Sequence, residues 1–207
     1  MVRFTGPRLK RYRRLGEGFA LAADRSAAEK FKKTQRKLPP GIHRRKASIR
    51  KMTQYGLQLT EKQKAKLFYL INERQLKNYY QKAAQKTGST SESLMALLES
   101  RLDNIVYRSG AVDSHRAARQ LVSHGHVLVN GKVVNVASYS LCPGSIISFK
   151  EPLKLKEKIK ESLARNLAPA YLKVDKDELK IEFLRAPARE EVDAPIDEKF
   201  IIEFYSR

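Results

Sequence analysis

The segment from residue 99 to residue 136 constrains the fold of this chain more than any other part of the sequence. Its first part predicts two short helices, one ended by Gly110 and the next capped by Ser114 and closed by Gly125. The remainder alternates around Asn130-Gly131, the strongest two-residue signal for a β-hairpin. We therefore expect a compact unit of two basic helices braced by a tight hairpin.

Apolar residues at helical spacing predict longer helices before this segment. One pattern runs from Thr60 to about Lys86, opened by a capping box at Thr60–Gln63 and bent near Arg74–Lys77. A further helix is expected to begin at Ser91 and to run into the segment 99–136. After the hairpin, the sequence predicts a charged helix at Leu155–Leu167. It also predicts three strands, at Ser145–Lys150, Leu179–Leu184 and Lys199–Tyr205. These elements define the fold class as α+β with a small antiparallel sheet.

The charge of the chain is large and unevenly distributed. Its 207 residues include 42 Lys and Arg against 22 Asp and Glu, a formal net charge of +20. Residues 1–51 carry 17 of the basic residues and only 3 of the acidic ones. Because such an excess repels itself unless a polyanion neutralises it, we expect a nucleic acid partner, with an anionic membrane as the weaker alternative. Residues 1–51 show little hydrophobic periodicity apart from Ser26–Lys33, which can form one or two helical turns, so we expect a basic, extended N-terminal arm that orders on its partner.

Several classes of protein are not expected. No apolar stretch approaches the roughly 20 residues that a membrane span needs. A single cysteine, Cys142, can form neither an internal disulfide nor a zinc cluster, which indicates a reducing compartment. His124 and His126 lack a third ligand of clear spacing, so no metal is expected. Asp103 is expected to pair with a nearby arginine rather than to act as a catalytic acid. Without a phosphate loop, a catalytic triad or a carboxylate cluster, the sequence predicts no enzyme, no cofactor and no small-molecule substrate.

The second of the two short helices carries the main candidate surface for RNA. Arg116, Arg119 and Gln120 fall three to four positions apart and share one face. Guanidinium groups on a rigid face can each make bidentate contacts to phosphate oxygens. We expect Arg101 and Arg108 to project from the polar side of the preceding helix. The predicted interface is completed by His124 at the helix end and by Asn130 and Lys132 at the hairpin tip. The alternative, a solvated face with ordinary ion pairs, is disfavoured by the net charge.

The N-terminal arm carries a second set of candidate RNA contacts. Its basic residues form two clusters, and Tyr12 is interleaved with the first, as suits stacking on bases or sugars. The predicted contacts are Arg3, Arg8, Lys10, Arg11, Arg13, Arg14, Arg44, Arg45, Lys46, Arg50 and Lys51. A flexible, solubilising tail is the alternative interpretation of this arm.

These patterns resemble a known family. The runs Arg101–Arg108, Ala118–His126 and Val129–Lys132 resemble the small RNA-binding module named after ribosomal protein four of the small subunit. Nearly the whole chain resembles full-length, bacterial-type members of that ribosomal protein family, through the runs Arg3–Lys10, Arg13–Gly16, Tyr55–Lys64, Glu73–Tyr80 and Phe200–Arg207. The motifs are long and ordered, which makes the resemblance specific.

The resemblance implies a role in the small ribosomal subunit. Such proteins bind small-subunit ribosomal RNA early in assembly, at a multi-helix junction of the 5′ domain. They lie beside small-subunit ribosomal proteins five and three, near the channel through which mRNA enters. The family's basic loop at that channel would fall on the cluster from Arg44 to Lys51. The contact with protein five, which tunes decoding accuracy, would involve Tyr55 and the C-terminal Phe204 and Tyr205. A cytoplasmic bacterial ribosome is implied, with an organelle-encoded one as the alternative.

The chain also departs from the family. Many members place four cysteines in the N-terminal arm and bind zinc, whereas this arm has no cysteine, so no zinc is expected. Members often read Pro-Gly-Gln-His-Gly where this chain has Pro40-Gly-Ile-His-Arg44, so the Gln and the second Gly of that turn are replaced.

The sequence thus predicts a non-enzymatic structural protein of the small ribosomal subunit. We expect a basic arm over residues 1–51, a helical domain over 52–98 completed by 185–207, and an RNA-binding module with antiparallel strands over 99–184. Two other classes share the module. RNA-modifying enzymes such as pseudouridine synthases add a catalytic domain for which this chain has no room. Small quality-control proteins that bind the large subunit lack the long arm and the C-terminal motif.

Overall fold

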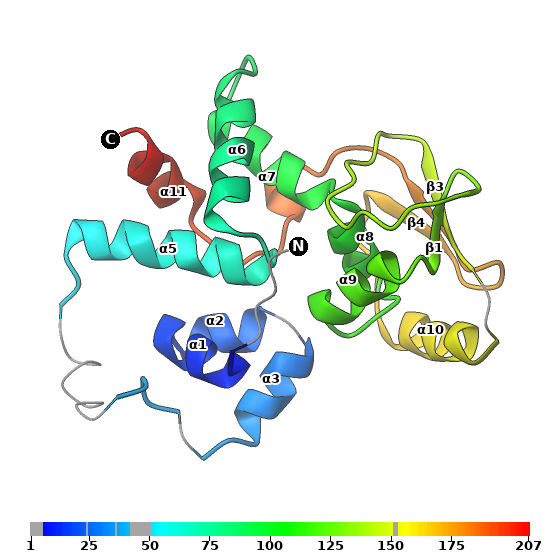
Figure 1. The fold of residues 1–207 in the computed structure, drawn as a ribbon, viewed down its shortest axis with the longest axis horizontal. Coiled ribbons are helices and arrows are strands. Elements are labelled where there is room, and N and C mark those ends of the chain that lie inside the picture. Colours follow the sequence, from blue (N-terminus) through cyan, green and yellow to red (C-terminus); the bar gives the residue numbers. More distant parts are fainter. Residues whose placement is uncertain (1–5, 24, 36, 42–50, 151–152) are drawn as a thin grey trace. The chain divides into compact units, whose positions relative to one another are not determined.

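A computed structural model describes residues 6–23, 25–35, 37–41, 51–150 and 153–207 (Figure 1). The chain divides into two compact units. The first comprises the described residues up to Ser91 together with Asp193–Arg207, and the second comprises Glu92–Val192. Among the helices of the described residues, none has the length and apolarity needed to cross a membrane.

The first unit begins with three short helices, where an extended arm was expected. Helices α1 (Arg8–Leu15), α2 (Glu17–Ala22) and α3 (Arg25–Lys32) pack on one another (Figure 1). Their contacts bury a small apolar set, Tyr12, Phe19, Ala20, Ala23, Ala27 and Phe31. The prediction of an extended arm was therefore wrong for α1 and α2, whereas α3 agrees with the helical turns expected over Ser26–Lys33. Apolar side chains three, four or seven positions apart are few here, but they suffice for helices that cover one another.

The helical pattern after residue 51 forms two helices instead of one bent helix. Helix α5 (Gln54–Phe68) begins after Thr53, whose hydroxyl accepts a hydrogen bond from the Gly56 amide at 3.2 Å. The capping box lies at Asn72 and Gln75, at the start of α6 (Glu73–Ala84), and not at Thr60–Gln63. The predicted bend thus becomes a break, in which Leu70 has a left-handed φ of 51°.

The C-terminal segment Lys199–Tyr205 is helical, although its apolar residues predicted a strand. Helix α11 (Glu198–Tyr205) begins after Asp197, whose carboxylate accepts a hydrogen bond from the Lys199 amide. Its side chains meet α5 and α6, and Gln58 donates a hydrogen bond to the Glu203 carboxylate at 2.9 Å. The first unit is therefore completed by the last residues of the chain.

The second unit is a five-stranded antiparallel sheet with helices packed on it. Its helices are α7 (Thr90–Glu99), α8 (Leu102–Arg108), α9 (His115–Ser123) and α10 (Leu153–Arg165), with a 3₁₀ turn at Arg189–Glu191. The first two residues of α7 are assigned to the first unit. Its strands are β1 (Val127–Val129), β2 (Lys132–Val133), β3 (Ser145–Phe149), β4 (Leu172–Asp175) and β5 (Lys180–Phe183), in the order β2-β1-β3-β5-β4. The predicted hairpin, the two predicted strands that became β3 and β5, and the charged helix that became α10 are confirmed.

One face of this sheet builds the core of the second unit. In the register of the sheet, Val129 pairs with Ile147 and Ile147 pairs with Ile181, and all three are buried. Ile105 of α8 and Leu163 of α10 belong to the same buried cluster. Burying a set of aliphatic side chains of this kind contributes about 1.5–3 kcal/mol for each one. The sheet is thus a rigid base on which α8 and α9 are held.

The first unit contains a pH-sensitive ion cluster that can be tested. Burial alone would raise the pKa of Glu73, but hydrogen bonds from Lys62, Lys66 and Tyr205 outweigh burial and lower the pKa from 4.5 to about 2. A carboxylate with a lowered pKa in the folded state stabilises the fold above its unfolded pKa and loses this effect as the pH falls toward the folded pKa. Because the Glu73 side chain is 46% exposed, solvent screens the effect, and we expect Glu73→Gln to lower the free energy of unfolding by about 1 kcal/mol at neutral pH.

Urea denaturation at a series of pH values checks this expectation. The free energy of unfolding of Glu73→Gln should fall less between about pH 5 and pH 2 than that of the unsubstituted chain. Glu29→Gln is the control, because Glu29 is exposed on α3 and forms no ion pair within the described part of the chain. Parallel pH profiles for all three proteins would contradict the role of Glu73.

Candidate nucleic-acid interface

The two helices of the predicted RNA-binding segment are joined by a sharply turned connection. Gly110 ends α8 with a φ of 83°. A Cβ atom at this position would lie 2.6 Å from Cβ of Asn166, whose amide donates a hydrogen bond to the Gly110 carbonyl at 3.0 Å. Both the left-handed backbone and the close approach require glycine here. The connection therefore fixes where α9 starts.

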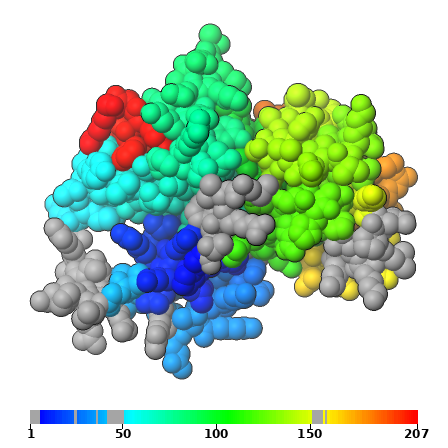
Figure 2. Space-filling model, in the orientation of Figure 1, coloured from blue at the N-terminus to red at the C-terminus, as the bar shows by residue number. Residues whose placement is uncertain are grey.

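Helix α9 presents a polar face away from the core. Ser114 caps it as predicted, because its hydroxyl accepts a hydrogen bond from the Ala117 amide at 3.2 Å. Ala118 and Val122 are buried in the core, whereas Arg116 and Gln120 are exposed one turn apart. The structure thus brings these two predicted contacts together on one accessible face. Figure 2 shows the surface of the second unit that includes α9 and the hairpin, in green to yellow-green.

Arg119 lies beside that face but is partly buried. Burial lowers the pKa of its guanidinium, and the nearby Arg101 adds to this, whereas the Asp103 carboxylate opposes it. An arginine stays protonated in proteins at neutral pH despite such shifts. Its charge is therefore held close to the protein surface with less freedom than that of an exposed side chain.

Arg101 does not project from a polar helix face, contrary to the prediction. Its side chain is 1% exposed, and its Nε and Nη2 atoms donate to the two oxygens of Asp103 at 3.1 and 2.8 Å. The predicted pairing of Asp103 with an arginine is confirmed. A guanidinium buried in this bidentate pair cannot reach a phosphate in this structure, so its role is to neutralise Asp103 at the start of α8.

Arg108 is also turned inward. It donates to both oxygens of the fully buried Glu99, at 3.1 and 2.9 Å, and its side chain is 13% exposed. The predicted projection of Arg101 and Arg108 failed because the helix breaks at Ser100–Arg101. At the break, the amides of Leu102 and Asp103 donate to the carbonyls of Tyr139 and Ala137, which lie far along the chain. These non-local hydrogen bonds separate α8 from α7, so the side chains of α8 do not continue the faces of α7.

The Glu99 carboxylate is the centre of a buried polar network. Besides Arg108, it accepts hydrogen bonds from the Asn104 amide at 2.6 Å and from the Tyr171 hydroxyl at 3.3 Å. The Asn104 carbonyl oxygen lies 3.2 Å from Nε2 of His115, and the His115 ring stacks on Tyr107 at a centroid distance of 3.7 Å. Burial, followed by the Glu99 charge, raises the pKa of Tyr171. The network joins α7, α8, α9 and the segment before β4, and so fixes the orientation of the α9 face.

The hairpin tip is only partly available for contacts. Asn130 and Gly131 have φ values of 49° and 78°, as a type I′ turn requires. The Asn130 side chain accepts a hydrogen bond from the Ile146 amide at 2.9 Å, so it also holds β3. Lys132 and His124 are exposed. The rings of His124 and His126 lie 6.2 Å apart, and no group of three or more His, Cys, Asp or Glu side chains among the described residues could hold a metal ion.

The described contacts of the N-terminal arm lie on α1, apart from Lys51, which precedes α5. Lys10, Arg14 and Lys51 are exposed, and Arg13 donates from Nε to the Leu38 carbonyl at 2.8 Å. Arg8 lies 5.8 Å from the centre of the Tyr12 ring, and Arg11 lines a pocket described below. Tyr12 itself is 3% exposed and packs on Phe19, so the prediction that it is placed to stack on bases was wrong. Five predicted contacts lie outside the described residues: Arg3, Arg44, Arg45, Lys46 and Arg50.

The predicted protein-partner contacts form one aromatic cluster in the first unit. Tyr55 is 52% exposed, and its ring lies 5.9 Å from that of Phe204. The Tyr205 ring stacks on Tyr80 at 5.2 Å, and the ammonium group of Lys62 lies 3.8 Å from the Phe204 ring centre. The cluster brings together positions that are about 150 residues apart in the sequence.

Sequence comparisons with known proteins identify the family to which this interface belongs. The family model of the ribosomal protein S4/S9 N-terminal domain matches residues 3–99, and that of the S4 domain matches residues 100–147. The helices α8 and α9 and the hairpin thus lie within an S4 domain, which assigns the chain to the class of ribosomal proteins that carry this domain.

Full-length relatives define the family more closely. The chain is 47% identical over 210 residues to small ribosomal subunit protein uS4 of Kosmotoga olearia. It is 45% identical to the uS4 proteins of Thermodesulfovibrio yellowstonii over 210 residues and of Thermotoga maritima over 212 residues. Each comparison covers 100% of both chains. The chain belongs to the uS4 family of ribosomal proteins, and it is not an enzyme.

Sequence reasoning missed the buried network that holds the interface. The signal was a run from Leu94 to Tyr107 with the spacing of a buried helix, interrupted by polar residues at Glu99 and Asn104. Polar groups within such a run require partners in the interior. Of their partners, Arg108 ends the same helix, but His115 and Tyr171 come from two other segments, so the pattern alone does not identify the whole network.

The network predicts a characteristic response to substitution. Glu99→Leu leaves the Arg108 charge buried without its carboxylate, so we expect it to lower the free energy of unfolding by about 3–5 kcal/mol. The double variant Glu99→Leu/Arg108→Met replaces the pair by apolar side chains and should recover much of that loss. Tyr171→Phe, which removes one hydrogen bond, should cost about 1 kcal/mol. Chemical denaturation of the four proteins measures these differences. A double variant no more stable than Glu99→Leu would contradict the paired role of Arg108.

Proposed function

We propose that this protein binds small-subunit ribosomal RNA directly, at a multi-helix junction of the 5′ domain, and nucleates assembly of the subunit. The observation that carries the proposal is the α9 face, where Arg116, Arg119 and Gln120 are held by the buried network around Glu99. Membership in the uS4 family and the net charge of +20 support the same function. The region 99–184 is the RNA-docking module in this proposal.

The mechanism is binding by pre-organised charge. Exposed Arg116 can direct a planar guanidinium at two phosphate oxygens, and partly buried Arg119 does so with less loss of side-chain freedom. Lys132 and His124 extend the surface to the hairpin and the helix end. Neutralising phosphates releases counterions, so the affinity should decrease as salt rises. Because α8, α9 and the sheet share one buried core, the charges can match the spacing of phosphates where RNA helices converge.

The first unit supplies a second set of contacts in this proposal. Lys10 and Arg14 on α1 and the exposed Lys51 would neutralise further phosphates. The expected contacts from Arg44 to Arg50 would extend along the channel through which mRNA enters. The aromatic cluster around Tyr55, Phe204 and Tyr205 would contact small-subunit protein five and so contribute to decoding accuracy, with protein three as a second neighbour. The setting is the cytoplasmic ribosome of a bacterium.

Equilibrium binding to RNA fragments over a salt series tests the proposed function. We expect tight binding to the 5′-domain fragment of small-subunit ribosomal RNA that persists at physiological salt, and weak binding to a large-subunit fragment. Equal, steeply salt-sensitive binding to both fragments would show a generic polyanion surface and would contradict the proposal.

The α9 face can be tested separately. Arg116→Gln with Arg119→Gln should weaken binding to the 5′-domain fragment at least about tenfold and reduce the steepness of the salt dependence by about two phosphate contacts. Lys176→Gln with Lys180→Gln removes the same charge from exposed positions in the β4–β5 turn and at the start of β5, and is the control. Circular dichroism should show native melting for both variants. Equal losses of affinity in the two double variants would mean that only net charge matters.

A further inference from the structure

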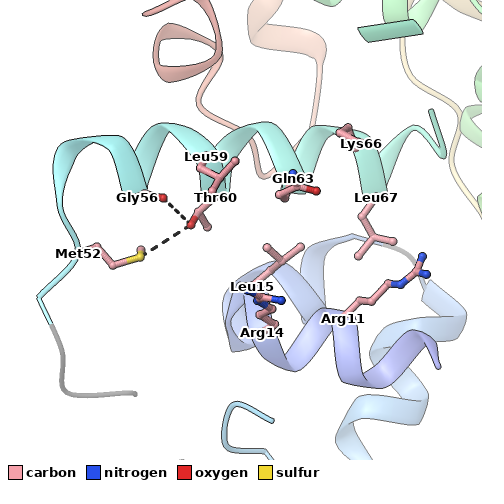
Figure 3. Close-up of a pocket in the computed structure, with 10 residues that line it drawn as sticks. All are labelled: Arg11, Arg14, Leu15, Met52, Gly56, Leu59, Thr60, Gln63, Lys66 and Leu67. Atoms are coloured by element: carbon pink, nitrogen blue, oxygen red, sulfur yellow. Dashed lines mark hydrogen bonds between the residues drawn. The ribbon is translucent and has the colours of Figure 1, made fainter. Parts of the chain in front are cut away.

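A pocket of the first unit includes the predicted RNA contacts Arg11 and Arg14, but its apolar walls have no role in the interface described above. It lies between α1 and α5, with a volume of about 670 Å³, within the range of sites for small organic groups. Figure 3 shows Leu15 rising from α1, Leu67 descending from α5, and Met52 reaching in from the segment before α5. Ten residues line it: Arg11, Arg14, Leu15, Met52, Gly56, Leu59, Thr60, Gln63, Lys66 and Leu67.

The walls of the pocket suit a flat, apolar group. Leu15, Leu59 and Leu67 supply aliphatic surface from both helices. Met52 is 50% exposed at the rim, and a thioether makes favourable contacts with aromatic rings. Thr60 is already engaged, because its hydroxyl donates to the Gly56 carbonyl at 2.7 Å. The Gln63 amide makes no hydrogen bond within the described residues, so it can donate to and accept from the edge of a base.

The charges of the pocket are positive. Arg11, Arg14 and Lys66 line it, and none of the lining residues is acidic. Lys66 is neutralised in part by its ion pair with Glu73 at 3.0 Å. Arg14 is exposed and forms no ion pair in the described part of the chain. The cations are therefore concentrated on the α1 side, next to the apolar wall.

We propose that this pocket takes one unpaired nucleotide of the bound RNA, with its base between the Leu and Met side chains and its phosphate against Arg14 and Arg11. The inference rests on the proposed RNA-binding function and adds a specific site to it. Apolar walls, an amide and adjoining guanidinium groups are the combination by which proteins hold splayed-out bases of RNA. An acidic peptide would use the same cations, but the net charge of the chain and of its first 51 residues favours a polyanion.

The test fills the pocket without changing charge. Gln63→Trp places a large side chain in it, and Gln81→Trp makes the same substitution at an exposed position of α6. The full-length proteins are bound to the 5′-domain RNA fragment, irradiated at a wavelength that crosslinks unmodified bases, and digested to map the crosslinked peptides. We expect crosslinks on α1 or α5 residues of the pocket in the unsubstituted chain and in Gln81→Trp, and their loss in Gln63→Trp. The affinity of Gln63→Trp should fall about tenfold, as expected for one stacked base.

A second pair of variants keeps the proposal testable if Gln63→Trp does not fold. Arg14→Gln and Arg74→Gln each remove one exposed arginine, the first from the pocket and the second from α6. Arg14→Gln should reduce the pocket crosslinks and weaken binding by several-fold more than Arg74→Gln does. Equal effects of the two substitutions on crosslinking and affinity would overturn the proposal.

Further outcomes distinguish a nucleotide of the bound RNA from other ligands of the pocket. Normal RNA binding without pocket crosslinks would overturn this inference alone, whereas absence of RNA binding by the unsubstituted chain would overturn the proposed function itself. Binding of free mononucleotides that Gln63→Trp abolishes, without pocket crosslinks from RNA, would assign the pocket to a free nucleotide and overturn the RNA source. A labelled peptide of alternating Glu and Leu that behaves in the same way would assign it to a protein segment.

Discussion

The buried carboxylate of Glu99 is the interaction on which the second unit depends. A charge without solvent contact is costly unless it is paired and fully hydrogen-bonded, and here Arg108, Asn104 and Tyr171 supply those partners. Asn104 and Arg108 come from α8 and Tyr171 from the segment before β4, so satisfying one charge of α7 fixes two other parts of the unit at once. His115 extends the network into the first turn of α9. The accessible arginines therefore lie on a helix, α9, whose position is fixed by this buried network.

The need of buried carboxylates for a paired cation also explains why the arginines of this unit have different roles. Arg101 and Arg108 neutralise the acidic residues Asp103 and Glu99 inside the fold. Arg116 remains on the surface, and Arg119 lies between the two environments. In sequence these four residues look alike, since each lies on a short basic helix. Burial separates the structural cations from those that can face a ligand.

The sequence predicted the parts of the structure that depend on local chemistry. The turn at Asn130-Gly131 and the cap at Ser114 are set by residues within a few positions, and both predictions are confirmed. The missed features depend on distant residues. The break before α8 is stabilised by carbonyls of residues 137 and 139, which no helical pattern reveals. The segment Lys199–Tyr205 is rich in the aromatic and β-branched residues that favour strands, but its surroundings are α5 and α6 rather than a sheet edge. For the same reason the residue types of the interface were predictable, whereas the orientation of Arg101 and Arg108 was not.

Because α11 completes the first unit, the two units fold in a different order from the one in which they are translated. Residues Glu92–Val192 form the second unit from one continuous stretch, so this unit can fold as soon as its last strand has emerged from the translating ribosome. The first unit must wait for Asp193–Arg207, because Gln58, Lys62 and Glu73 meet their partners on the final helix. The half of the protein that is translated first is therefore the half that matures last.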